Sequence, residues 1–187
     1  MSRPISHPST IADELGRVAG ALGGGELEAL CSAVLGAERI FVAGAGRSGL
    51  MMRALAMRLM HLGLKVYVVG EVVTPGVAPG DLLLIGSGSG STASLVAAAA
   101  KAQQIGADVA LITIDTTSSI AVIASTVVTI PAPSPKARQQ GRIESVQPMG
   151  SLFEQSLLLV GDGLIMSLMH HLDTDSETMF QRHANLE

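Results

Sequence analysis

Short, continuous apolar runs recur along this chain, and stretches with helical spacing lie between them. Five such runs predict strands, at residues 39–43, 65–69, 81–85, 108–114 and 126–130. Longer stretches predict helices at 9–22, 26–35, 47–62, 92–105 and 151–171, with a short one near 118–124. Strands without polar alternation are buried on both faces. The pattern therefore predicts an α/β fold, a parallel sheet flanked by helices on both faces.

The length of the chain suits one domain. It has 187 residues, of which 48% are hydrophobic, enough for a single sizeable core. We predict one domain over 1–187, with N-terminal helices at 1–36, an α/β core at 37–171 and a C-terminal tail at 172–187. Residues 131–148 include four prolines and predict a loop long enough to be functional or mobile.

The composition argues against several classes of binding partner for this domain. The formal net charge is −4 and no Lys/Arg-rich run occurs, so nucleic acid and anionic membranes are poor partners. The one cysteine, Cys31, permits no intrachain disulfide and argues against a cysteine metal site. The N-terminus lacks the form of a signal peptide, and glycines and polar residues interrupt the apolar stretches short of a membrane span. We expect a cytoplasmic protein. A small anionic ligand is still compatible with this composition, because backbone N–H groups can bind phosphate without a basic patch.

Two glycine-rich turns each follow a predicted strand and open a predicted helix. The first, Gly44-Ala45-Gly46-Arg47-Ser48-Gly49, fits GxGxxG. Glu71 ends the next strand about 20 residues later, as in dinucleotide-binding folds. Three interpretations stay open for this turn: contact with another ligand, dinucleotide binding, or glycines that only let strand and helix pack closely.

The second turn runs from Gly86 to Thr92 and combines three glycines, three serines and a threonine. Glycines let the backbone N–H groups turn toward one point, and the hydroxyl groups add donors there. The N-terminus of the next helix adds a partial positive charge. These features predict a phosphate cradle that needs no lysine. The alternative is a flexible Ser/Gly loop in which Thr92 caps the helix.

Ser87, Ser89 and Thr92 form Ser-x-Ser-x-x-Thr, which resembles the phosphate loop of the sugar isomerase (SIS) domain family. Four further stretches resemble the 6-phospho-3-hexuloisomerases of this family, at 41–49, 57–63, 150–155 and 182–187. The resemblance implies a single SIS-type domain with a five-stranded, Rossmann-like three-layer fold, and a homo-oligomer, expected to be a tetramer. Residues 115–125 depart from the family pattern, because they lack a proline and a second aspartate.

The resemblance also implies a reaction. A 6-phospho-3-hexuloisomerase interconverts 3-hexulose 6-phosphate (D-arabino-hex-3-ulose 6-phosphate) and fructose 6-phosphate through a cis-enediol, without a cofactor or a metal. It belongs to the ribulose monophosphate pathway of formaldehyde fixation, beside 3-hexulose-6-phosphate synthase. One alternative is a non-catalytic sugar-phosphate-binding regulatory module, although such modules usually carry an effector domain of which this sequence gives no sign. Another is a dinucleotide enzyme, which predicts cofactor binding at Gly44–Gly49 instead of Ser87–Thr92.

Moving a carbonyl group to the neighbouring carbon requires a carboxylate or histidine that takes and returns a proton. The resemblance favours Glu154 as this base, whereas the residues alone favour a capping box formed by Ser151 and Glu154. His61 and His183 are candidates for ring opening or proton shuttling, also across a subunit boundary. Their structural alternatives are a cation at a helix C-terminus for His61 and an ordered C-terminal contact for His183.

The substrate-binding residues are expected in the two turns. Four hydroxyl side chains are expected to bind the phosphate: Ser48, Ser87, Ser89 and Thr92. Three residues are expected to add backbone N–H groups: Gly88, Gly90 and Ser91. Gly46 belongs to this set, and Arg47 either binds substrate or pairs with an acid. Asp162 is expected to make a structural or subunit contact. His170 and His171 lack a third ligand, so we expect no metal site.

Overall fold

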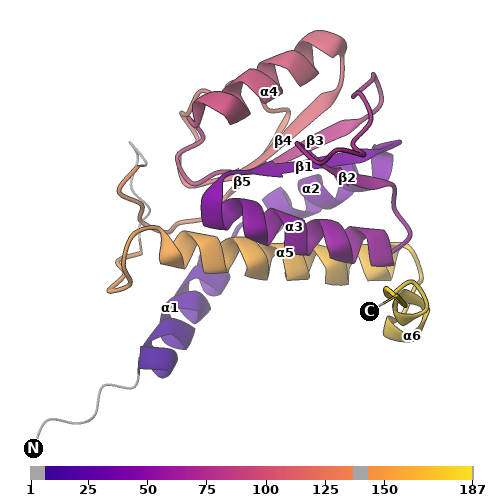
Figure 1. Cartoon of the computed structure of the whole chain (residues 1–187). Helices are drawn as coiled ribbons and strands as arrows, with labels where there is room; N and C mark the ends of the chain where they lie inside the picture. Colours follow the sequence, from indigo (N-terminus) through magenta and orange to yellow (C-terminus); the bar gives the residue numbers. More distant parts are fainter. Residues whose placement is uncertain (1–6, 137–142, 187) are drawn as a thin grey trace, which may run out of the picture.

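The fold is one parallel sheet covered by helices. A computed structural model describes residues 7–136 and 143–186 (Figure 1). Its strands are β1 (Ile40–Gly44), β2 (Val66–Val68), β3 (Leu82–Gly86), β4 (Asp108–Thr113) and β5 (Thr126–Thr129), in the order β2-β1-β3-β4-β5. All four strand pairs are parallel. The predicted five-stranded parallel sheet is confirmed, and each strand boundary lies within one residue of the prediction.

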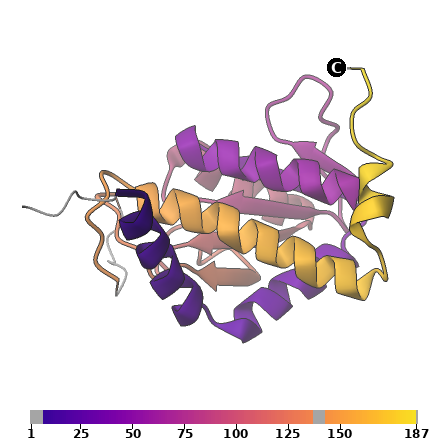
Figure 2. The same cartoon turned by 90° about the horizontal axis from the view of Figure 1, so that it is seen from below.

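Helices cover the two faces of this sheet unequally. On one face lie α1 (His7–Ala21), α2 (Gly24–Gly36), α3 (Gly46–His61) and α5 (Ser151–His171), and Figure 2 shows α3 and α5 side by side in front of the strands. On the other face lies α4 (Ala93–Ile105). The side chains of β1 alternate between the two faces of the sheet. Val42 packs into the core between the sheet and helices α3 and α5, whereas Phe41 packs into the core between the sheet and α4. The predicted three-layer arrangement is confirmed.

The strand order creates a crevice at one edge of the sheet. From β1 the chain passes through α3 to β2 on one side, and from β3 it passes through α4 to β4 on the other. The connections after β1 and β3 therefore diverge to opposite faces. In open α/β sheets, ligands bind at this switch point, outside the carboxyl ends of the strands.

Helix α5 contacts all three other helices on its face of the sheet, α1, α2 and α3. By length and composition it could cross a membrane, and so could the bent pair α1–α2 if it were one span. The expectation that every apolar stretch falls short of a span is therefore wrong for α5. Half of its apolar window is buried in the fold, against α3, α1 and α2, and the core helix of a soluble protein has the same composition.

Two local predictions differ from the structure. Residues 118–124 form turns instead of a helix, because the Ile120 N–H donates to the Gly90 carbonyl group (3.0 Å) and the side chain is fully buried. The predicted C-terminal tail contains a short helix, α6 (Ser176–Phe180), which Asp175 caps: its carboxylate accepts the Thr178 N–H at 2.8 Å. The predicted 131–148 loop lies partly outside the described residues.

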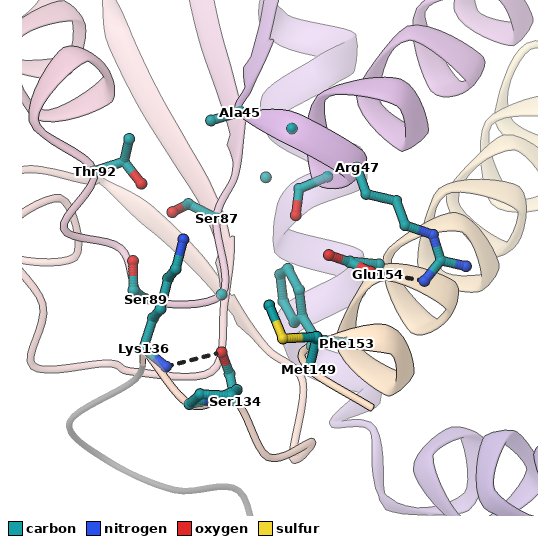
Figure 3. A pocket seen from close by; sticks show the side chains of 16 residues that line it. Ala45, Arg47, Ser87, Ser89, Thr92, Ser134, Lys136, Met149, Phe153 and Glu154 are labelled. Carbon is teal, nitrogen blue, oxygen red and sulfur yellow. Dashed lines mark hydrogen bonds and ion pairs between the residues drawn. The ribbon is translucent and has the colours of Figure 1, made fainter. Parts of the chain in front are cut away.

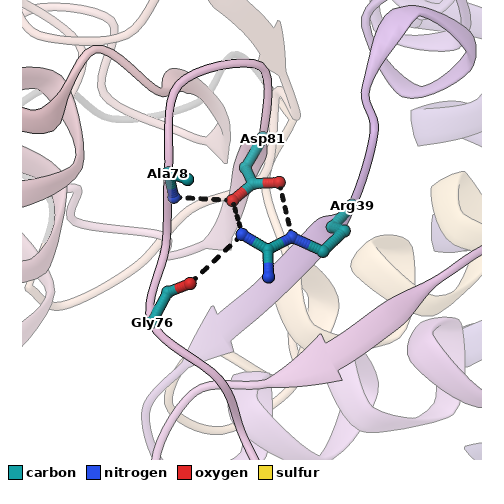
Figure 4. Close-up of polar contacts among 4 residues, drawn as sticks. All are labelled: Arg39, Gly76, Ala78 and Asp81. Carbon is teal, nitrogen blue, oxygen red and sulfur yellow. Dashed lines mark hydrogen bonds and ion pairs between the residues drawn. The ribbon is translucent and has the colours of Figure 1, made fainter.

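At the amino ends of the strands, a buried carboxylate ties three segments together (Figure 4). The Arg39 guanidinium donates two hydrogen bonds to Asp81, at 2.9 and 2.6 Å, and a third to the Gly76 carbonyl at 3.2 Å. The Ala78 N–H donates to the same carboxylate at 2.7 Å. Asp81 is only 1% exposed, and the Arg39 hydrogen bonds hold its pKa below the usual value. This cluster fixes the long connection between β2 and β3.

Candidate active site

A cavity of about 330 Å³ lies at the switch point of the sheet (Figure 3). Both glycine-rich turns line it, together with residues 134–136 and the first turn of α5. Segments that are far apart in the sequence therefore meet at the carboxyl ends of β1 and β3, where the fold predicts a ligand.

Three helix N-termini open on this cavity. The residues that precede α3, α4 and α5 are Ala45, Thr92 and Gly150, and all three line it. None of the three makes a side-chain capping hydrogen bond. The first N–H groups of a helix have no partner within it and carry a partial positive charge. This arrangement suits an anionic ligand.

The Ser/Gly turn after β3 is held in one conformation by the neighbouring loop. The Gly88 carbonyl accepts from the Ile114 N–H and from the Thr113 hydroxyl group, both at 3.2 Å. The Gly90 carbonyl accepts the Ile120 N–H at 3.0 Å. Both carbonyl groups thus accept hydrogen bonds from the 113–120 segment, which does not line the cavity. Thr92 occupies the N-cap position of α4 without making a capping bond, so its hydroxyl group is available to a ligand.

The glycines of the first turn have two different tasks. A Cβ atom on Gly44 would lie 2.9 Å from the Gly49 Cα, and one on Gly49 would lie 2.7 Å from the Gly44 carbonyl oxygen. The packing interpretation therefore accounts for these two. Gly46 has a φ of +57°, which favours glycine, and it lines the cavity with open space around it. Glu71, the acid that a dinucleotide site would use, is paired with Arg53.

Glu154 projects into this cavity from the first turn of α5 and pairs with Arg47 there (Figure 3). The Arg47 Nη1 and Glu154 Oε2 atoms are 2.8 Å apart, and the carboxylate side chain is 20% exposed. The capping box does not form, because the Ser151 hydroxyl group donates to the Pro148 carbonyl at 2.7 Å. Met149, with a φ of +60°, makes the tight turn into α5.

Seven of the nine predicted binding residues line this cavity: Gly46, Arg47, Ser48, Ser87, Gly88, Ser89 and Thr92. The other two do not. The Gly90 N–H donates to the Ser87 carbonyl at 3.2 Å within the turn, and Gly90 packs against Ser118. Ser91 is exposed, with its N–H 3.4 Å from the Ser89 hydroxyl oxygen. The binding roles of all nine stay predictions.

The two candidate histidines lie elsewhere in the subunit. His61 and His183 stack with ring centroids 5.5 Å apart and line a second cavity of about 310 Å³, with Arg58 and Asp162. His61 ends α3, whereas Gly46 begins it at the first cavity, so roughly 22 Å of helix separates them. Burial, reinforced by the Arg58 charge and by His183, lowers the pKa of His61. This environment favours the neutral form of the imidazole.

Sequence reasoning missed several cavity residues, namely Ser134, Lys136, Met149 and Phe153. The prolines and charges of the 131–148 loop were the signal that could have found Ser134 and Lys136. Among the described residues, no group of three His, Cys, Asp or Glu side chains could hold a metal ion. His171 instead approaches Glu28, with the Nε2 and Oε1 atoms 3.4 Å apart.

Comparison with known proteins identifies the family. The SIS domain model matches residues 34–159, which include both turns, the sheet and the start of α5. The chain belongs to the SIS domain family.

Two relatives that match this SIS protein over nearly their whole length share one name. It is 49% identical to a 3-hexulose-6-phosphate isomerase of Bacillus subtilis, over 99% of this chain and 100% of the relative. It is 42% identical to a 3-hexulose-6-phosphate isomerase of Mycobacterium gastri, over 96% and 89%. Among solved structures, it resembles a hypothetical protein of Methanococcus jannaschii whose structure infers a molecular function of 3-hexulose-6-phosphate isomerase. The TM-score is 0.84 and the identity 30%, with 98% and 100% of the two chains covered.

Proposed function

We propose that this SIS protein is a 3-hexulose-6-phosphate isomerase, which interconverts D-arabino-hex-3-ulose 6-phosphate and fructose 6-phosphate. One observation carries the proposal: three uncapped helix N-termini and a carboxylate line the same cavity. The first feature suits a phosphate group and the second suits proton transfer on a sugar. The names of the relatives in Bacillus subtilis and Mycobacterium gastri support the same activity.

In this proposal the phosphate group binds at the Ser/Gly turn. The hydroxyl groups of Ser87, Ser89 and Thr92 line the cavity next to the N-terminus of α4, and Ser48 faces it from the first turn of α3. Hydrogen bonds from hydroxyl and N–H groups to a phosphate oxygen are charge-assisted and strong. Anchoring the phosphate leaves the rest of the sugar to extend toward Glu154.

Glu154 then transfers the proton. With the carbonyl group at C3, Glu154 removes the proton from C2. The electrons of that bond form the C2–C3 double bond, and the former carbonyl oxygen on C3 takes a proton from water, which gives a cis-enediol. The hydroxyl group on C2 then loses its proton to water and becomes the carbonyl group, while the electrons of the double bond take a proton from Glu154 at C3, which gives fructose 6-phosphate. No electron leaves the sugar, so the reaction itself calls for no redox cofactor. Arg47, 2.8 Å from Glu154, orients the carboxylate and offers a donor to the enediolate oxygen.

The histidine pair serves this reaction only from another subunit. Because His61 and His183 lie at the far end of α3, we propose that they complete the active site of a neighbouring subunit in a homo-oligomer, expected to be a tetramer. The neutral imidazole of His61 suits ring opening, which needs both an acid and a base.

The proposed metabolic role follows from the substrate. A 3-hexulose 6-phosphate arises when formaldehyde is joined to ribulose 5-phosphate, so the partner reaction is that of 3-hexulose-6-phosphate synthase. The protein would act after it in the ribulose monophosphate pathway of formaldehyde fixation, in the cytoplasm.

The first test is turnover of enzymatically generated 3-hexulose 6-phosphate by the wild type and by Glu154→Gln. We expect fructose 6-phosphate from the wild type, with solvent deuterium appearing at C3 when the reaction runs in D₂O. The variant should lose about a hundredfold or more in kcat, the scale of general-base loss. Glu28→Gln is the matched control, because Glu28 is an exposed carboxylate on α2.

Two results would change this picture. If Glu154→Gln stays as active as Glu28→Gln, the reaction stands but its base is another residue. If the wild type gives no product although fructose 6-phosphate raises its Tm, the protein is a sugar-phosphate-binding regulatory module instead.

A further inference from the structure

We propose that Lys136 supplies the cation that binds the substrate phosphate in this site. The inference rests on the proposed function for the identity of the substrate, but its argument comes from the cavity. The Ser/Gly turn provides hydroxyl and N–H donors and no charged side chain. Lys136 reaches it from the loop after β5, about 45 residues further along the chain.

The Lys136 side chain enters the cavity. Figure 3 shows it extending from the loop toward Ser87 and the Ser/Gly turn, on the side of the cavity away from Arg47. The backbone of Lys136 is held by its own loop, with its N–H 3.4 Å from the Ser134 hydroxyl oxygen. The side chain thus approaches the Ser/Gly turn from the loop after β5.

The other charged side chains of the cavity pair with each other, so Lys136 is the one that can bind an anionic ligand. Three ionisable side chains among the described residues line the cavity, and two of them, Arg47 and Glu154, neutralise each other at 2.8 Å. In the part of the chain that the structure describes, no ion pair involves Lys136. Its ammonium group is therefore the uncompensated charge of the site.

A phosphate monoester needs such a charge. It carries about −1.5 to −2 charges at pH 7, whereas each helix N-terminus contributes only about half a positive charge. An ammonium group is a compact point charge that suits phosphate oxygens. Lys136 adds a full positive charge, so the total positive charge around the phosphate comes closer in magnitude to the negative charge of the dianion.

This role predicts a specific kinetic signature. The phosphate on C6 keeps its charge while C2 and C3 react, so Lys136 holds the substrate and the transition state equally. Loss of uniform binding raises KM and leaves kcat unchanged.

The test compares Lys136→Met, Lys136→Arg and the control Lys65→Met, an equal change of charge at an exposed residue beside β2. For Lys136→Met we expect KM to rise about tenfold or more, the range of a charge-assisted hydrogen bond, with kcat within about twofold. The inhibition constant of inorganic phosphate should rise in parallel. Lys136→Arg should retain most of the affinity, and Lys65→Met should match the wild type.

If the wild type is active, each other outcome rejects the assignment. An unchanged KM for Lys136→Met, or an equal rise for Lys65→Met, means that Lys136 is not the phosphate ligand. A fall in kcat with KM unchanged would mean that Lys136 acts on the reacting carbons and not on the phosphate group. If the wild type turns over no 3-hexulose 6-phosphate, the proposed function fails. In that case the Kd of fructose 6-phosphate, measured by calorimetry on the same variants, still decides the role of Lys136.

Discussion

At the scale of single residues, the Arg39–Asp81 contact is the clearest determinant of stability. Asp81 is 1% exposed and accepts hydrogen bonds from Arg39 and from the Ala78 N–H. Asp81→Asn removes the charge but keeps the shape, and it leaves the guanidinium without its carboxylate partner. We expect Tm to fall by about 5 °C, because breaking a buried pair costs far more than an exposed one.

Thermal unfolding followed by circular dichroism at pH 7 measures this effect. Asp13→Asn, an exposed aspartate on α1, is the control and should leave Tm within about 1 °C, as surface substitutions do. Residual activity at 25 °C should stay near that of the wild type, because Asp81 lies at the amino ends of the strands, opposite the cavity. A Tm equal to that of Asp13→Asn would contradict the structural role of this pair.

Residues of the site differ in how well the sequence could predict them. Ser87, Ser89 and Thr92 lie in one continuous turn, so their meeting depends only on local backbone. Glu154 required the family resemblance, because a carboxylate three residues after Ser151 equally fits a capping box. The prolines and charges around Lys136 marked its loop as a candidate, but its place beside Ser87 could not be predicted, because that depends on how the chain returns from β5 across the edge of the sheet.

At the scale of elements, periodicity predicted every strand and all five long helices, because each buries one continuous apolar surface. It failed where long-range hydrogen bonds decide. Residues 118–124 have helical composition, but Ile120 donates to Gly90 of the Ser/Gly turn. Sequence patterns cannot reveal this partner, and the turn it stabilises is the proposed phosphate site.

The connection before α5 depends on the N-terminal helix α1. Glu14 is 1% exposed and accepts hydrogen bonds from the Ser145 hydroxyl at 2.5 Å, and from the Val146 N–H and the Gln147 side chain, both at 2.9 Å. Burial alone would raise the pKa of Glu14, but these hydrogen bonds and the Arg17 charge together hold it below 4.5. Helix α1 thus positions the turn that leads to Glu154.

Glu14→Gln should therefore destabilise the protein in a pH-dependent way. At pH 7 we expect a loss of about 2 kcal/mol in the free energy of unfolding, the scale of hydrogen bonds to a charged group. The folded pKa is lowered, so the unfolded chain binds more protons, and the contribution of Glu14 is present above pH 4.5. It is lost as the pH falls through the folded pKa.

Urea unfolding at pH 7 and at pH 3.5 measures the difference between wild type and Glu14→Gln. The gap should narrow at the lower pH, whereas Glu28→Gln should stay close to the wild type at both. A gap that is independent of pH would mean that shape, and not the charge of Glu14, holds the connection.

At the scale of the whole molecule, the two cavities lie at opposite ends of α3. One holds Glu154 and the Ser/Gly turn, and the other holds the stacked pair His61 and His183 with exposed apolar neighbours, Met166 and Phe180. One subunit cannot bring the two sets of groups to the same sugar. In the oligomer that we propose, the first cavity of one copy would meet the second cavity of its neighbour, and symmetry would repeat that contact in every copy.

Hybrid oligomers test this arrangement. Glu154→Gln and His61→Ala are each expected to be inactive as pure oligomers; His183→Ala, exposed and less able to disturb folding, repeats the experiment. After subunit exchange in an equal mixture, about a quarter of the sites pair an intact Glu154 with an intact histidine from the neighbour, so about a quarter of wild-type activity should return. Native mass spectrometry establishes that hybrids have formed. If they form without any gain in activity, the histidines do not complete the site of another subunit, and the stack of His61 on His183 only anchors the C-terminal segment to α3.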